Sequence, residues 1–101
     1  MSTTKRGLVI ADSITSGETD IPTAGTAVQI ITASTPCFRV IVSNINATNA
    51  IYVGDSTVDK TSARGIRLNS GEHVAIDVDD ASKIYVDGTS NGDDAGYLIF
   101  K

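Results

Sequence analysis

Few residues in this chain have the chemistry to carry out a reaction, and their spacing matches no catalytic arrangement. His73 is the only histidine among 101 residues, so a metal site built on two histidines is excluded. Nucleophilic catalysis needs a base beside the nucleophile. His73 could act as the base for one of the many serines, but no GxSxG-like sequence accompanies it. We therefore expect no catalytic residues, and we interpret His73 as a structural residue on an exposed strand face.

Two groups of aspartates are the candidates for holding a cation, because Ca²⁺ takes several oxygen ligands from a flexible loop. Neither group follows the EF-hand order, which has a Gly in the middle of the loop and a Glu at its end. The same carboxylates could pair for glycoside hydrolysis, but no aromatic platform accompanies them. We expect no metal and no cofactor, and whether these loops take up a cation stays open. The two groups are Asp77, Asp79 and Asp80, and Asp87, Asp93 and Asp94.

Cys37 is the single cysteine, which excludes a disulfide within the chain. Its neighbours Phe38 and Val40 indicate that it is a small buried apolar residue. The glycines form neither a GxGxxG nor a Walker sequence, so no phosphate-binding loop is indicated.

The net charge is −4, and it is unevenly distributed along the chain. A negative protein with few aromatic side chains is poorly suited to nucleic acid, because phosphates are bound by Lys and Arg and bases stack on aromatic rings. Residues 1–71 hold six basic and five acidic side chains, whereas residues 72–94 hold seven acidic ones against Lys83 alone. This acidic end forms either a solvated rim or a complement to a basic partner surface.

The elements that must position these residues are short β-strands. Val, Ile and Thr are abundant and Trp is absent, and β-branched residues favour strands. A chain of 101 residues is long enough for one domain with its own core. We expect no membrane segment and no signal peptide, because every apolar run is too short for either. The sequence therefore predicts a soluble protein made in the cytoplasm.

The stretch from Gly71 to Gly88 shows the clearest alternation of apolar and polar residues. A period of two indicates strands with one buried face. The polar break at 79–82 is compatible with a hairpin or with a corner between two packed sheets. The apolar members are Val74, Ile76 and Val78 in the first strand and Ile84 and Val86 in the second.

The rest of the chain contains further short strands and no window with a helical period. The stretch from Asp12 to Gly25 is rich in Ser, Thr and Gly and is predicted to be a long loop or a frayed edge. In total, about eight short strands predict an all-β fold, a single-domain antiparallel β-sandwich, either jelly-roll or immunoglobulin-like. The sandwich would span residues 7–101, after a flexible N-terminal arm at 1–6. The other strands are expected at 8–10, 26–33, 38–42, 50–53, 66–68 and 97–100.

The second half of the chain resembles small virion proteins of tailed bacteriophages. The sequence IYVGD at 51–55, followed by GIRLNSGE at 65–72 and DVDDASKIYVDG at 77–88, is similar to a pattern that recurs near their C-terminus. The similarity runs from Phe38 to the C-terminus and is a pattern of strands and turns. Asn69-Ser70 stands where a proline is expected before Gly71-Glu72, and residues 1–33 carry no such similarity.

The resemblance implies a non-enzymatic structural protein. It would be a decoration or cement protein that stabilises the outside of the assembled capsid, or a small head-fibre or tail-associated subunit, commonly a homotrimer. Its partners would be the major capsid protein or neighbouring virion subunits, with no membrane or nucleic acid involved. Lys5 and Arg6 are the candidate residues for contact with the shell, although a solvated tail explains them equally well. An apolar flank of the sandwich is the candidate for self-association.

Three other functions stay open. A receptor- or carbohydrate-binding module of a tail or fibre would require a concave site lined by aromatic rings or Ca²⁺, and the chain has three tyrosines and two phenylalanines to build one. An enzyme would require His73 beside a serine or an aspartate. A bacterial surface or toxin-associated β domain is the last alternative.

Overall fold

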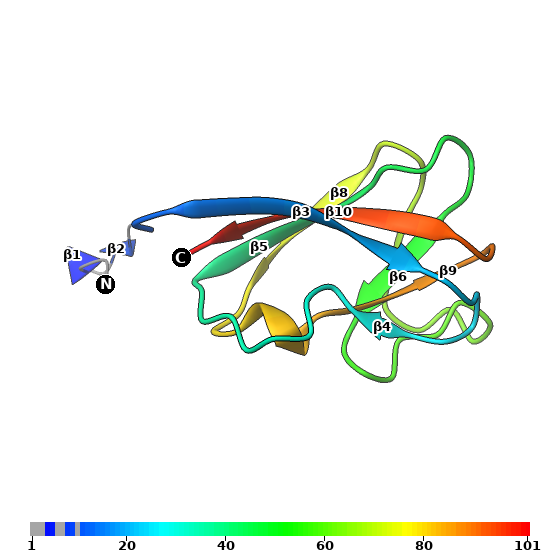
Figure 1. Cartoon of the computed structure of the whole chain (residues 1–101), viewed down its shortest axis with the longest axis horizontal. Helices are drawn as coiled ribbons and strands as arrows, with labels where there is room; N and C mark the ends of the chain where they lie inside the picture. Colours follow the sequence, from blue (N-terminus) through cyan, green and yellow to red (C-terminus); the bar gives the residue numbers. More distant parts are fainter. Residues whose placement is uncertain (1–3, 6–7, 10) are drawn as a thin grey trace.

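A computed structural model of the chain describes residues 4–5, 8–9 and 11–101. Eight strands of the described residues form two four-stranded antiparallel sheets, which face each other as a sandwich (Figure 1). A short 3-10 helix, η1, lies at Ala81–Lys83. The strands of the sandwich are β3 Ile14–Ile21, β4 Val28–Gln29, β5 Arg39–Asn44, β6 Ile51–Gly54, β7 Ile66–Leu68, β8 His73–Asp77, β9 Tyr85–Gly88 and β10 Asp93–Phe100.

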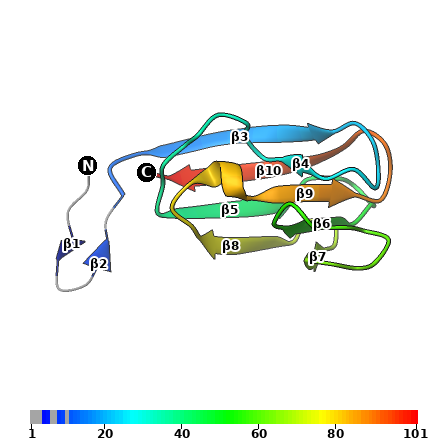
Figure 2. The ribbon, with the colours of Figure 1, turned by 90° about the horizontal axis from the view of Figure 1, so that it is seen from below.

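The strand order is that of a jelly roll. The first four strands of the sandwich pair with the last four in reverse order, β3 with β10, β4 with β9, β5 with β8 and β6 with β7. The two sheets have the orders β3-β10-β5-β8 and β4-β9-β6-β7 (Figure 2). Jelly rolls distribute eight strands over two sheets in this way, whereas immunoglobulin domains use unequal sheets. The predicted all-β sandwich is confirmed, and the strand order selects the jelly roll from the two topologies.

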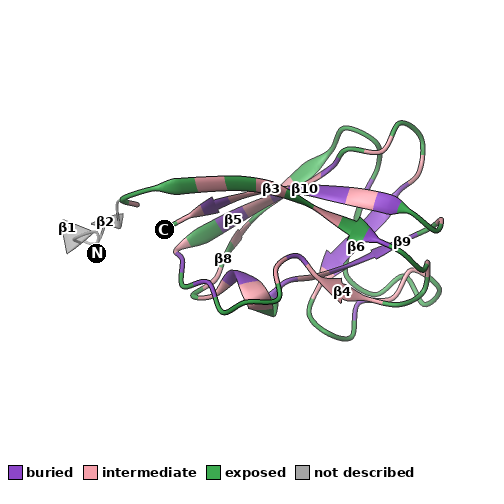
Figure 3. Cartoon of the chain, in the orientation of Figure 1, coloured by how far each residue is buried: buried purple, intermediate pink, exposed green. Residues whose placement is uncertain are grey.

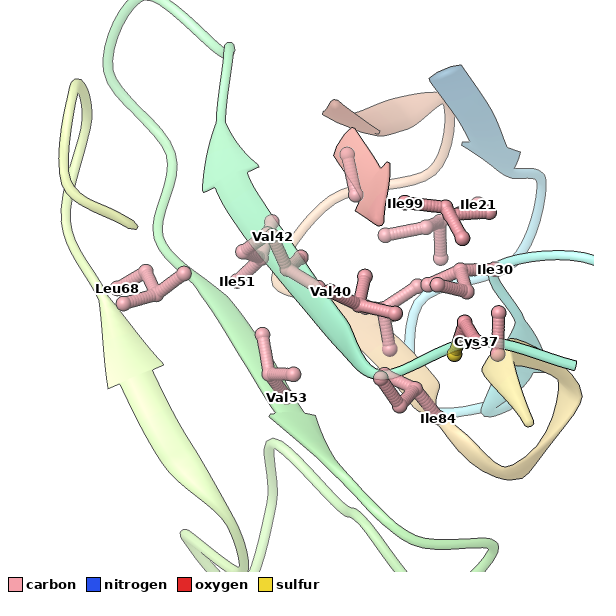
Figure 4. Close-up of a cluster of buried hydrophobic side chains, with 13 residues drawn as sticks. Ile21, Ile30, Cys37, Val40, Val42, Ile51, Val53, Leu68, Ile84 and Ile99 are labelled. Atoms are coloured by element: carbon pink, nitrogen blue, oxygen red, sulfur yellow. The ribbon is translucent and has the colours of Figure 1, made fainter. Parts of the chain in front are cut away.

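The core lies between the two sheets and is built from alternate residues of each strand. In β5, Val40 and Val42 are buried while Arg39 is exposed, because successive side chains point to opposite faces. Cys37 belongs to this core, as its apolar neighbours predict. Figure 4 shows how the core side chains from both sheets meet. The buried members are Ile21, Ile30, Cys37, Val40, Val42, Ile51, Val53, Leu68, Ala81, Ile84, Val86, Ala95 and Ile99.

The polar break in the alternating stretch is a corner between the sheets. β8 belongs to one sheet and β9 to the other, and η1 lies between them. Asp80 caps η1, because its carboxylate accepts a hydrogen bond from the Ser82 backbone N–H at 2.9 Å. The same carboxylate accepts the Ser34 hydroxyl at 2.5 Å and the Thr35 backbone N–H at 2.8 Å. These hydrogen bonds, that of Ser34 foremost, hold the pKa of Asp80 well below its ordinary value.

For 12–25 the sequence predicts a long loop or a frayed edge; the loop is wrong for most of this length, and the position at an edge is right. Ile14–Ile21 forms β3, an eight-residue strand at the edge of its sheet. The strand escapes detection because three of its four inward positions carry Thr or Gly. A side chain on Gly17 would lie 2.5 Å from the Tyr97 hydroxyl, so the ring of Tyr97 fills the space that an apolar residue of β3 would occupy. The stretch 26–33 contains only the two-residue β4, and β10 begins at Asp93, four residues before the strand predicted at 97–100.

The N-terminal segment contains a separate pair of short strands. β1 (Thr4–Lys5) and β2 (Leu8–Val9) pair with each other in a two-stranded sheet, which lies beyond the end of the sandwich in Figure 1. Lys5 is therefore part of a strand in the predicted arm, whereas Arg6 lies outside the described residues, as do residues 1–3. In the part of the chain that the structure describes, no helix has the length and apolar character needed to cross a membrane.

Candidate functional site: an exposed sheet face

The outer face of the β3-β10-β5-β8 sheet carries a group of apolar side chains. The alternate residues of these strands fill the core, so the side chains between them point away from it. Ile14 is 60% exposed, Ala75 is exposed, and the other three are half-buried. We call this group the apolar patch. It consists of Ile14, Ile41, Ala75, Leu98 and Phe100.

The strand register arranges the apolar patch in adjacent rows that cross the sheet from β3 to β8. The central row contains Ser16, Leu98, Ile41 and Ala75. The row on one side contains Ile14, Phe100, Arg39 and Asp77. The row on the other side contains Glu18, Gly96, Ser43 and His73. The apolar side chains are therefore contiguous across all four strands, with polar residues around them. A contiguous apolar area with a polar rim is typical of an interaction surface.

The charges around the apolar patch differ between its sides. Arg39 pairs with Asp77 at 2.7 Å on the exposed surface. Their hydrogen bond and mutual attraction raise the pKa of Arg39 and lower that of Asp77. Asp20 and Asp94 are register neighbours at the opposite end of the strands, where the face is acidic. The patch therefore lies between an ion pair and a carboxylate-rich end.

The outer face of the other sheet is covered by the chain itself over its central strands, β9 and β6. Tyr52 alternates with the core residues Ile51 and Val53, so it points outward, yet it is only 7% exposed. Asp87, its register partner on β9, is fully buried. The Asp87 carboxylate accepts backbone N–H groups of Gly25 at 2.9 Å and Lys60 at 2.8 Å. These hydrogen bonds hold the loops 22–27 and 55–65 against the sheet.

Five of the six aspartates considered as cation ligands, all but Asp94, have side-chain contacts within the part of the fold that the structure describes. Asp93 is buried and accepts the backbone N–H groups of Thr89 and Ser90 at 3.0 Å, while Asp79 forms an exposed ion pair with Lys83 at 2.7 Å. Asp77, Asp80 and Asp87 have the partners given above. Among residues 4–5, 8–9 and 11–101, no three His, Cys, Asp or Glu side chains are grouped closely enough to hold a metal ion.

The two other candidate reactive residues lie far from each other in the fold. His73 is exposed at the start of β8, opposite Ser43 on β5. Cys37 is buried, and its Sγ atom donates to the Val78 carbonyl at 3.3 Å. Burial is the main cause that raises the pKa of the Cys37 thiol, and Asp80 and Asp79 contribute. A depression of about 310 Å³ lies beside it, lined by Asp12, Ser13, Pro36, Cys37, Phe38 and Lys101.

The sequence indicates an apolar flank for self-association without locating its residues. The signal was present in two strands that are apolar at consecutive positions, Phe38–Val42 and Tyr97–Phe100. Such runs are typical of strands buried on both faces. In the structure both strands are central in the sheet, but their outer faces are open to solvent.

Comparisons of the chain with protein-family models, with curated proteins and with solved structures give no match.

Proposed function

We propose that this protein is a non-enzymatic structural protein of a bacteriophage virion, which binds the outside of the assembled head and stabilises it. The proposal joins two observations. The stretch from Ile51 to Gly88 resembles small virion proteins of tailed bacteriophages, and the fold is a jelly roll, an architecture used in viral capsid and lectin domains. Its partners would be the major capsid protein or neighbouring virion subunits.

The observation that carries the proposal is the apolar patch on one open sheet face. A protein that holds surfaces together needs an area whose removal from water is favourable. A contiguous apolar area has this property. Bound copies would stabilise the assembled shell because they bind that state and not its dissociated subunits. Self-association of the copies would raise their avidity for the shell, even where each contact is weak. The resemblance favours a homotrimer for this self-association.

The N-terminal segment is the second proposed contact. Lys5 lies in β1, which pairs with β2 beyond the end of the sandwich (Figure 1). The positive charges of Lys5 and Arg6 would attract an acidic shell surface, and such a contact weakens as salt screens it. We propose Lys5 and Arg6 as the residues that make it.

Sedimentation with purified heads tests the proposal. Heads assembled without this chain are mixed with the purified protein, pelleted, and analysed for bound copies and for resistance to heat. Saturable binding of many copies per head, with a higher temperature of head disruption, is the expected result. Heads that pellet without the protein would contradict the proposal. Binding to a glycan array instead would favour the tail- or fibre-associated carbohydrate-binding module.

A further inference from the structure

We infer that the apolar patch is covered by the same sheet face of a second copy of this chain, and that a twofold axis parallel to the strands, between β10 and β5, relates the two copies. The inference rests on the self-association that the proposed function includes. The self-association would then be a twofold dimer through this sheet face and not the trimer that the resemblance favours.

The register of the sheet is what makes this face complementary to itself. Rotation about an axis between β10 and β5 places β10 on β5 of the second copy, and β3 on β8 of the second copy. Each row of residues then faces the same row of the second copy. In the central row, Leu98 then meets Ile41 of the second copy. Because a twofold interface uses the same patch on both copies, this apolar contact is made twice. Two half-buried apolar side chains on each copy are thereby removed from water.

The rows on either side of the centre bring together two pairs that attract and one that does not. Ile14 lies against Asp77 of the second copy, and the carboxylate of Asp77 is paired with Arg39 of its own chain. In the same row, Phe100 lies against Arg39 of the second copy, and a guanidinium over an aromatic ring is a favourable pair. In the other, Glu18 of β3 lies opposite His73 on β8 of the second copy. The carboxylate accepts a hydrogen bond from an imidazole N–H in either charge state of the ring. In these three rows, no carboxylate faces another carboxylate.

The alternative twofold axis, across the strands, gives a worse match. It would place each strand on the same strand of the second copy, with the two ends exchanged. Phe100 would then meet Asp94, and Ile14 would meet Asp20. Apolar groups would be buried against carboxylates that have lost their water, which is costly. The parallel axis leaves only Ile14 of these apolar residues against a carboxylate, and that carboxylate is paired with Arg39. The distribution of charge therefore favours the axis that is parallel to the strands.

The size of the face sets the strength of the expected contact. Four strands at about 4.8 Å spacing, and six residue steps of about 3.4 Å from Ile14 to Asp20, give a flat area of roughly 400 Å² per copy. The two copies together bury roughly 800 Å² of flat area, which is below the 1,200–2,000 Å² or so of stable complexes. We therefore expect a weak, concentration-dependent dimer rather than a permanent one.

Cross-linking between engineered cysteines tests the geometry. Positions 18 and 73 in one chain are three strand spacings apart, roughly 14 Å, which is too far for a short bismaleimide to join. In the inferred dimer they face each other across the interface. The double variant Glu18→Cys/His73→Cys should therefore give a covalent dimer at high protein concentration. The matched control, Glu18→Cys/Arg67→Cys, places the second thiol on the other sheet and should not.

Molar mass in solution tests the surface. The wild type should shift from monomer to dimer as concentration rises. The variant Ile14→Asp sets a carboxylate against Asp77 of the second copy. It should raise the dissociation constant at least about tenfold. Ile66→Asp makes the same change at a residue of the other sheet that is 49% exposed, and it should not alter the dimer. Both positions are exposed, so both variants should fold, which circular dichroism verifies.

Four results would overturn the inference: a wild type that is monomeric up to about 1 mM, a trimer, an Ile14→Asp variant that dimerises like the wild type, or equal cross-linking of the control pair. Each leaves the proposed function standing if purified heads still bind the protein. Loss of head binding by a protein that still dimerises would instead contradict the proposed function alone.

Discussion

The two outer faces of this jelly roll are both built from antiparallel strands, but they differ in how far their side chains are exposed to solvent. Over the central strands β9 and β6, the outward residues Tyr52 and Asp87 are buried, and hydrogen bonds to Asp87 hold loops 22–27 and 55–65 there. Over the β3-β10-β5-β8 sheet the side chain of Ile45 covers Gly96, whereas Ile14 is exposed and Leu98 and Phe100 are half-buried. Figure 3 shows the contrast, since β6 is largely buried and β3 is largely exposed or intermediate.

Because of this difference, we expect substitutions on one face to change folding stability and substitutions on the other to change association with other molecules. The covered face contains residues whose polar groups are satisfied only by their own chain, so changes there should cost folding free energy. The open face contains residues with few partners inside the molecule, so changes there should cost little stability and act on association instead. Paired substitutions on the two faces test this separation.

Asp87→Ala should have the largest effect on stability. It leaves the backbone N–H groups of Gly25, Lys60 and Gly88 without their acceptor beneath two loops. We expect a loss of at least about 3 kcal/mol, because each buried group without a partner costs roughly 1–3 kcal/mol. Urea denaturation measures it. Asp77→Ala, on the open face, is the matched control and should leave the free energy of unfolding almost unchanged; equal losses would contradict the contrast between the faces.

Gly65→Ala should have the next largest effect. Gly65, in the loop over the covered face, has φ +108, and a Cβ atom there would lie 2.7 Å from the Val53 carbonyl oxygen. Gly71 also has a positive φ, +81, but open space around it. Gly71→Ala therefore reports the backbone strain alone, of about 1 kcal/mol. We expect Gly65→Ala to cost about 2 kcal/mol more than that, measured by urea denaturation. Similar losses would show that loop 55–65 is loosely packed.

Asp80→Asn should change how stability depends on pH. Hydrogen bonds from Ser34, Thr35 and Ser82 lower the folded-state pKa of Asp80 from its ordinary value of 3.8. A lowered pKa adds stability that is fully present above the ordinary value and is lost as pH falls toward the folded value. The wild type should therefore lose more stability than Asp80→Asn below about pH 4, measured as the urea midpoint at several pH values. Parallel profiles would contradict this role.

Arg39→Gln should have the smallest effect on folding. The Arg39–Asp77 pair is exposed, and exposed ion pairs contribute little to stability. We expect the urea midpoint to stay within error while association at high concentration weakens, because Phe100 of the second copy loses its cation. A clear loss of stability would show that the open face contributes to folding as the covered face does.

Alternation predicted the sandwich and its core because burial of one strand face leaves a period of two in the sequence. Val74, Ile76 and Val86 show it plainly. The edge strand β3 escaped prediction because its inward side is filled by Tyr97, a residue some eighty positions away. The open face escaped because a strand that is apolar on both sides has the same pattern whether its outer side is covered or exposed. Neither distinction is local, so neither could be predicted from the periodicity of a single strand.

Oxidative labelling of side chains in dilute and concentrated solution tests the central claim most directly, because it measures the accessibility of both faces in one experiment. The account predicts that Leu98 and Phe100 become protected as concentration rises, while Tyr52 is protected at every concentration. Leu98 and Phe100 labelled equally at all concentrations, or Tyr52 labelled as strongly as they are, would contradict it.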